Sequence, residues 1–207
     1  MESIISRAFD LVVLLSKKFN IDESHSLKHS MEVYNFALKI YESELEMNHY
    51  LEQQKDIIIL AAILHDTIDK KYVDESVGLE EIRNYMADHV SPEKIEIIFQ
   101  IITTMSYSTV KKQGFPLLNE YQLAYHIVRE ADLLAAYDID RCIIYSMYKK
   151  SMNYIEAVNA ATILFENRVF KHRTDKLFVT SFSKKLSIQL HKKAKKDVDI
   201  LTRSLNI

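Results

Sequence analysis

The chain has 207 residues, of which 48% are hydrophobic and 27% are charged, the balance of a globular protein with enough apolar residues for a core. Its formal net charge of −2 argues against a protein that binds nucleic acid or an anionic membrane through a basic overall field. Only two glycines and two prolines occur, which is too few for a turn-rich β architecture. The composition therefore favours helices joined by short polar connections.

The N-terminal segment and the single cysteine bear on the cellular location. The apolar run at residues 11–15 is short and follows Arg7 and Asp10, whereas a membrane span needs roughly 20 apolar residues. We interpret it as part of an amphipathic helix and expect no membrane contact. Cys142 cannot form an intramolecular disulfide, so a reducing, cytoplasmic location is expected.

Apolar residues recur at three- and four-residue spacing along nearly the whole chain, which is the period of helices with one buried face. The predicted fold class is an all-α, compact multi-helix bundle that forms a single domain over residues 1–207. The pattern predicts helices over residues 2–18, 23–47, 51–67, 76–88, 92–106, 120–136, 139–150, 154–170 and 175–203.

Three of the predicted helix starts have capping residues. Ser91 precedes Pro92, a proline suited to the first helical position. Asn153 with Glu156 resembles a capping box, and Asn119 with Gln122 has the same spacing.

The segment at residues 106–118 does not follow the helical period. It holds one of the two glycines, one of the two prolines and a lysine pair. A loop of this length is often a lid or a binding loop, although a plain surface excursion is an equal alternative.

The pair His65-Asp66 ends a strongly apolar segment. A chain of this composition would hold roughly 0.5 such pairs by chance, so the dipeptide alone is weak evidence. Its position says more, because a buried, unpaired polar pair costs several kcal/mol and therefore needs water, a hydrogen bond or a metal. The alternative is that Asp66 and Thr67 end the helix near solvent.

Two further polar features lie on predicted helices. His25 and His29 are four residues apart and share a helix face, and we expect His25 to be a neighbour of the site rather than a ligand. Asp132 lies in a mostly apolar helix and needs a partner, for which Arg129, three residues earlier, is the simple alternative to a metal.

The order of these residues, H…HD…D, resembles the HD superfamily of metal-dependent phosphohydrolases, in particular its small members with nucleotide pyrophosphatase activity. The likeness spans residues 22 to about 140 and is carried by the strings DESHSLKHSMEVYNFALKIY, AAILHDTIDKKY and SYS…HIVREADLLAAYDI. It implies a metal-binding core over about 22–140, with the helices of 141–207 packed on it.

The resemblance also implies a ligand set for one divalent metal ion. The implied ligands are His29, His65, Asp66 and Asp132. Two imidazoles and two carboxylates suit Mn²⁺, which we favour, and also Mg²⁺, Ni²⁺, Fe²⁺ or Zn²⁺.

The sequence departs from these relatives at five places near the motif, which bears on substrate and activity. Ser26 follows His25, where relatives usually have an aspartate, and Glu32 stands three residues after His29, where relatives usually have an arginine. The other departures are at Met105, Leu133 and Ala135.

The function expected from the resemblance is hydrolysis of a phosphoester or phosphoanhydride of a nucleotide or small phosphorylated metabolite by metal-activated water. Asp66 and Asp69 are the candidate catalytic residues, with Asp69 placed one helical turn after His65 to position or deprotonate the water. A surface ion pair with Lys70 or Lys71 is the alternative for Asp69. The candidate substrate contacts are Lys70, Lys71, Lys112 and Arg129.

Two other functions stay open. Because the sequence departs from the family pattern, one alternative function is a nucleotide-binding or regulatory module with weak catalysis. A nuclease or nucleic-acid partner would use the lysine-rich segment at 183–203, but its apolar spacing favours a packed helix with a solvated outer face. A homodimer is compatible with the sequence.

Overall fold

The computed structural model describes residues 3–206, and in that range the chain forms helices and no strand, which confirms the all-α prediction. The helices are α1 (Ile4–Phe19), α2 (Leu27–Leu45), α3 (Lys55–Leu64), α4 (Glu75–Met86), α5 (Pro92–Thr104), α6 (Tyr107–Gln113), α7 (Gln122–Ala135), α8 (Ile139–Lys150), α9 (Tyr154–Asn167) and α10 (Ser181–Ser204). Short 3-10 helices lie at η1 (His49–Gln54), η2 (His65–Ile68), η3 (Asn119–Tyr121) and η4 (Val169–Lys171). None of the described helices is both long and apolar enough to cross a membrane.

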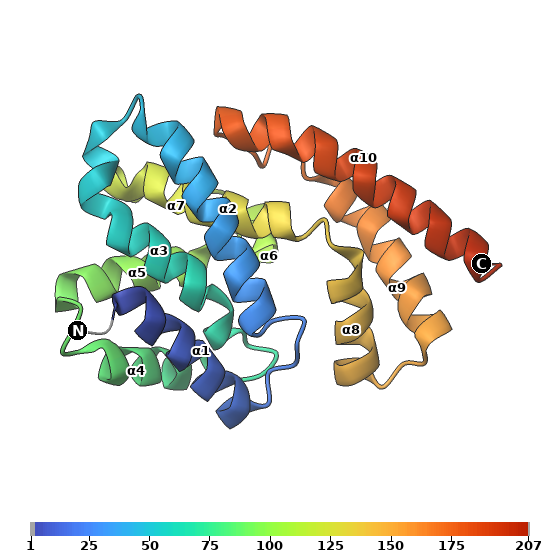
Figure 1. Ribbon diagram of the computed structural model, residues 1–207, viewed down its shortest axis with the longest axis horizontal. Coiled ribbons are helices and arrows are strands. Elements are labelled where there is room, and N and C mark those ends of the chain that lie inside the picture. Colours follow the sequence, from blue (N-terminus) through green and yellow to red (C-terminus); the bar gives the residue numbers. More distant parts are fainter. Residues whose placement is uncertain (1–2, 207) are drawn as a thin grey trace.

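Helix α3 is the centre of the larger group of helices (Figure 1). Residues 57–64 are all buried, and α3 packs against α1, α2, α5 and α7. A helix that is apolar on every face can only be stable in such a position. The chain therefore leaves the core at the C-terminal end of α3, where the His65-Asp66 pair follows.

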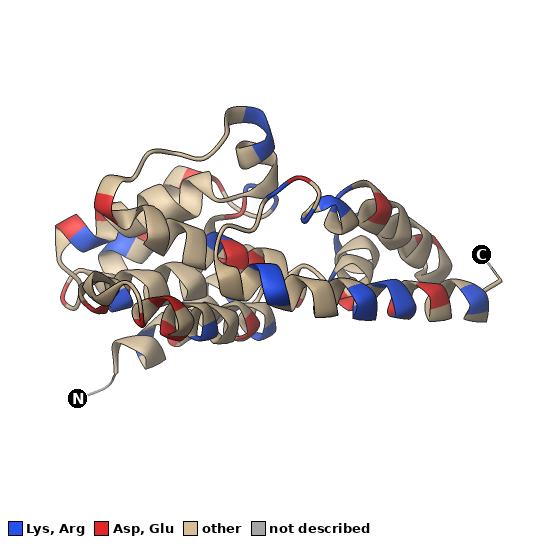
Figure 2. Ribbon diagram, turned by 90° about the horizontal axis from the view of Figure 1, so that it is seen from above, with Lys and Arg blue, Asp and Glu red and all other residues tan. Residues whose placement is uncertain are grey.

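The C-terminal helices lie beside this group. Helices α8 and α9 pack on each other, and α10 runs across α2, α7 and α9 (Figure 1). The buried face of α10 consists of Ser183, Ser187, Ala194 and Val198. On α10, Lys184, Lys185, Lys192, Lys193, Lys195 and Lys196 precede Asp197 and Asp199, and uncharged stretches of helix separate the basic groups (Figure 2). This is the pattern of a solvated helix face rather than of a continuous basic surface.

Two of the three predicted caps are present. The Ser91 hydroxyl accepts a hydrogen bond from the Lys94 amide, with Pro92 in the first turn, and Asn153 and Glu156 form a complete capping box. The prediction for Asn119 is wrong.

Asn119 has a φ of 47° and begins η3, and α7 starts only at Gln122. The Gln122 side chain instead accepts a hydrogen bond from the Leu118 amide. The loop predicted at 106–118 is only partly a loop, because residues 107–113 form α6.

The predicted helix at 51–67 is also interrupted. It consists of η1, α3 and η2, and the chain becomes extended at Asp69. The helices predicted at 154–170 and 175–203 are shorter, at Tyr154–Asn167 and Ser181–Ser204.

Candidate metal centre

Three segments that are distant in the sequence bring four polar side chains to one point beside the core. His29 comes from α2, His65 and Asp66 from η2, and Asp132 from α7. The Nε2 atoms of His29 and His65 are 3.1 Å apart. Donor atoms of His29, His65 and Asp66 all lie within 4.8 Å of one another.

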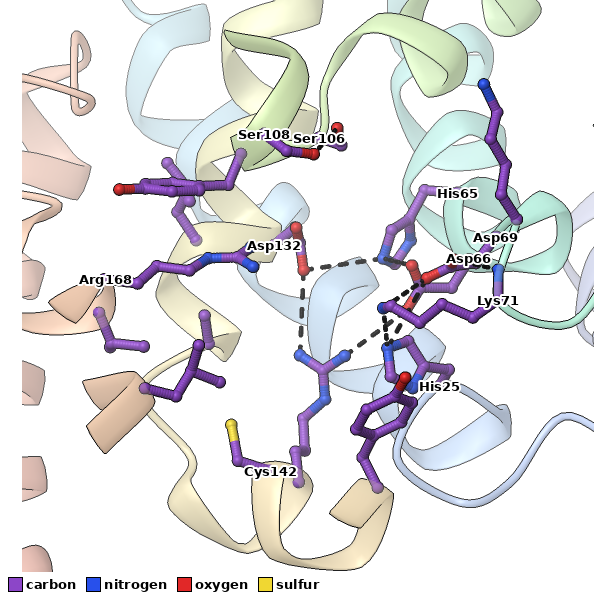
Figure 3. A pocket seen from close by; sticks show the side chains of 18 of the residues that line it. His25, His65, Asp66, Asp69, Lys71, Ser106, Ser108, Asp132, Cys142 and Arg168 are labelled. Atoms are coloured by element: carbon purple, nitrogen blue, oxygen red, sulfur yellow. Dashed lines mark hydrogen bonds and ion pairs between the residues drawn. The ribbon is translucent and has the colours of Figure 1, made fainter. Parts of the chain in front are cut away.

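Asp132 faces the same point. Its Oδ1 atom is 3.4 Å from His29 Nε2 and 3.8 Å from His65 Nε2. Arg129, the alternative partner, forms no ion pair with Asp132. The structure thus brings together the four residues that the resemblance implied as ligands, of which Figure 3 shows His65, Asp66 and Asp132.

The hydrogen bond on the far side of the His65 ring fixes its tautomer. Nδ1 of His65 lies 2.9 Å from the Ala62 carbonyl oxygen, and a carbonyl can only accept, so Nδ1 carries the hydrogen. The lone pair of Nε2 then faces the cluster, as a metal-binding histidine requires.

The electrostatics of the cluster favour a cation at this point. Burial would raise the pKa of Asp66, but the imidazoles of His65, His25 and His29 outweigh burial and hold it well below its usual range. The pKa of Asp132 is lowered for the same kind of reason, mainly by His29 against the effect of burial.

Burial would lower the pKa of His29, and Arg141 acts in the same direction. Hydrogen bonds with Asp132 and Asp66 outweigh both effects and raise it. The two imidazole Nε2 atoms lie 3.1 Å apart and carboxylate oxygens surround them. This set of nitrogen and oxygen donors fits a divalent metal ion.

Arg141 is a site residue that the sequence analysis missed. Its Nε–H donates to the Ser24 carbonyl at 2.7 Å, which aims the guanidinium at the cluster, 3.5 Å from Asp66 and 3.9 Å from Asp132. It lies on α8, which follows the helix of Asp132 after residues 136–138. No local spacing in the sequence predicts that Arg141 contacts the cluster.

His25, Asp69 and Lys71 form a second polar group next to the cluster (Figure 3). The Lys71 ammonium donates to Asp69 at 2.8 Å and lies 3.1 Å from His25 Nε2. Since an ammonium can only donate, Nε2 of His25 is the acceptor and its Nδ1–H faces Ser24. Burial lowers the pKa of His25 to about 4, so its ring is neutral at pH 7.

The geometry of Asp69 differs from the prediction. Because η2 ends before it, Asp69 is not on a continued helix, and its carboxylate binds the Lys71 side chain as the alternative interpretation had it. It nevertheless lines the same pocket as the cluster.

The cluster opens into a pocket of about 760 Å³ between η2, α6, α8 and α9. The charged residues of its lining include Asp66, Asp132 and Arg141. The lining also contains small or apolar side chains, namely Met105, Cys142, Ala160, Ala161, Leu164 and Val169.

Lys71 and Lys70 both line the pocket, but the Lys70 side chain is 76% exposed and pairs with Glu75.

The substrate contacts predicted for Arg129 and Lys112 do not fit this geometry. Arg129 is buried and donates to the Leu177 carbonyl and to Glu130. Glu130 in turn accepts hydrogen bonds from the backbone at Val179 and Thr180, so this buried pair fixes the segment before α10. Lys112 is exposed on α6, and neither residue lines the pocket.

Comparison with known proteins identifies the family. The profile described as HD domain matches residues 26–140, which is more than half of the chain and includes all four cluster residues. The chain belongs to the HD domain family, whose members are generally metal-dependent hydrolases.

A crystal structure of a protein from Lactobacillus plantarum, a structural genomics target, has the same fold. It superimposes with a TM-score of 0.67 at 23% sequence identity, covering 100% of this chain and 99% of that one. No curated protein matches the chain.

Proposed function

We propose that this protein is a metal-dependent phosphohydrolase that acts on a nucleotide or a similar small phosphorylated metabolite. The observation that carries the proposal is the convergence of His29, His65, Asp66 and Asp132 beside a pocket of about 760 Å³. Mn²⁺ is the metal that we favour for this mixed nitrogen and oxygen donor set.

Such an ion, when bound, lowers the pKa of a water molecule and polarises a phosphoryl oxygen. The chain's own residues would do the rest. Lys71 and Arg141 would bind phosphate oxygens, since both are cationic and border the pocket. Asp66 would hold the ion, and Asp69 would accept a proton from the attacking water, because a carboxylate at the rim can pass it to solvent.

The mixed lining of the pocket supports a nucleotide as the substrate. Phosphates would lie against the charged side chains, and the apolar side chains from α8 and α9 would accommodate a base. The volume of about 760 Å³ falls within the range of small-molecule sites.

The test is a nucleotide panel assayed with separate detection of phosphate and pyrophosphate release. Protein stripped of metal and then reloaded with Mn²⁺ should turn over at least one nucleotide, and the stripped protein should not. Full turnover without metal would refute the proposal. Nucleotide-dependent thermal stabilisation with no hydrolysis of any panel member would instead identify a binding module.

A further inference from the structure

Arg168 is a cation in the pocket that has no acceptor of its own. It follows the last residue of α9 and lines the pocket, where its guanidinium points toward Asp132 (Figure 3). No hydrogen bond or ion pair joins its side chain to any residue within 3–206. The two other arginines near this part of the interior, Arg129 and Arg141, each donate to a backbone carbonyl and a carboxylate.

The surroundings of Arg168 hold its backbone and guanidinium in place without neutralising the charge. Its amide donates to the Leu164 carbonyl, and the next two residues, Val169 and Phe170, are buried. The guanidinium lies over the Tyr107 ring, with 4.4 Å between Cζ and the ring centroid. Stacking on an aromatic face orients the planar group while its N–H donors stay available at the edge.

Arg168 and Lys71 approach the pocket from opposite sides of the carboxylate cluster (Figure 3). Arg168 is not close enough to Asp132 for an ion pair, so it does not serve as the direct counterion of that carboxylate. A ligand with a single phosphate on the cluster side would leave Arg168 without an acceptor, whereas a chain of linked phosphates offers oxygens to both sides.

We propose that Arg168 is a second anion-binding subsite that binds a further phosphate group of the substrate, so the pocket selects compounds with two or more linked phosphates over monophosphates. This inference rests on the proposed function. The planar guanidinium suits it, because Arg binds phosphate oxygens in a bidentate manner.

The test compares two non-hydrolysable probes, methylenediphosphonate and methylphosphonate, by calorimetry on Mn²⁺-loaded protein at fixed free Mn²⁺. Wild-type protein should bind the diphosphonate more tightly. Arg168→Gln should weaken diphosphonate binding about tenfold and methylphosphonate binding less than about threefold, because one charged hydrogen-bonding group is lost. Arg168→Lys, which keeps the charge but not the planar donors, should give an intermediate loss.

Arg173→Gln is the matched control, since Arg173 is exposed, lies five residues further along and does not line the pocket. It should bind both probes as wild type does. Equal losses for the two probes, no loss at all, or loss of bound Mn²⁺ from Arg168→Gln would overturn the inference and leave the proposed function standing. A wild-type protein that binds neither probe would count against both.

Discussion

Lys71 is a candidate substrate contact because of its position in the structure and not because of its charge alone. Lys70 and Lys71 are adjacent lysines, yet only the Lys71 ammonium points inward, to Asp69 and His25, while Lys70 pairs with Glu75 at the surface. The sequence gives no reason to separate the two, because both follow the same motif. The direction of the extended chain after η2 separates them.

We expect Lys71→Met to lower kcat/KM by about 10- to 100-fold, because a charged hydrogen bond to substrate contributes about 1.5–3 kcal/mol. Lys70→Met removes the same charge and is the matched control, with an expected change of less than about threefold. Steady-state kinetics on the best nucleotide of the panel measures both variants. Equal effects of the two substitutions would show that the lysines act only through the overall electrostatic field of the protein and not through a direct contact with substrate.

Other site residues differ in how far they could be predicted. His29, His65, Asp66 and Asp132 could be named because polar residues on apolar helices need a partner, and their order resembles a known family. Arg141 and Arg168 could not, because arginines near helix ends usually face solvent and their contacts depend on how α8 and α9 fold back. Arg129 was assigned to the pocket from its spacing to Asp132, but its side chain turns to Glu130 and Leu177.

At the scale of elements, helix α4 supports the segment that contains His65 and Asp66. Gly78 of α4 lies against Ile68 of η2, and a Cβ atom at Gly78 would come within 2.9 Å of the Ile68 Cγ2 atom. The close approach of α4 therefore requires glycine at this position.

Gly78→Ala should destabilise the protein, although alanine favours a helix by about 0.5–1 kcal/mol over glycine. Overpacking against Ile68 costs about 1–3 kcal/mol and outweighs that gain. The free energy of unfolding from urea denaturation measures the difference. Asn84→Ala, an exposed change on the same helix, is the control, and a Gly78→Ala variant more stable than wild type would show that η2 moves aside freely.

The helices were predicted best where the periodic pattern of apolar residues extends over many residues and the capping residues are complete. Helix α8 was predicted at its observed bounds, and α9 has the predicted capping box. Helix α6 was missed because it has only seven residues, with Val110 as its one buried residue, so no helical period can be seen in the sequence. Its ends are nevertheless marked, by Ser106 as the N-cap and by Gly114 with a φ of 78°.

At the scale of the whole molecule, the pocket lies where the C-terminal helices meet the helices around α3. Helix α7 contributes Asp132 and the buried pair of Arg129 and Glu130, and this pair holds the segment that leads into α10. The cluster of candidate metal ligands and the attachment of the C-terminal helices thus depend on one helix. Sequence periodicity predicts each helix but not this arrangement, which results from contacts between segments some 50 residues apart.

Acid should destabilise the fold through a buried histidine away from the cluster. Burial lowers the pKa of His172 to about 3, and neither of its ring nitrogens has a partner among the described residues. In the unfolded chain its pKa is about 6.5, so the unfolded state binds the extra proton as the pH falls below 6.5. Its contribution is complete above pH 6.5, and about 2 kcal/mol of it is lost between pH 7 and pH 5.

His172→Leu should therefore show a smaller loss of unfolding free energy between pH 7 and pH 5 than wild type, measured by urea denaturation at both values. The same substitution at the exposed residue His89 is the control and should leave the pH dependence unchanged. An unchanged pH dependence in His172→Leu would mean that His172 takes up its proton in the folded protein.

The most direct test of the account is the metal content of the purified protein after loading with Mn²⁺ and dialysis, measured by elemental analysis. We expect about one ion per wild-type chain and almost none in His65→Ala or Asp132→Ala. His25→Ala should keep its metal, because the Lys71 ammonium occupies the His25 Nε2 atom. Wild-type protein without metal, or His65→Ala and Asp132→Ala variants that both retain a full equivalent with wild-type helicity, would contradict it.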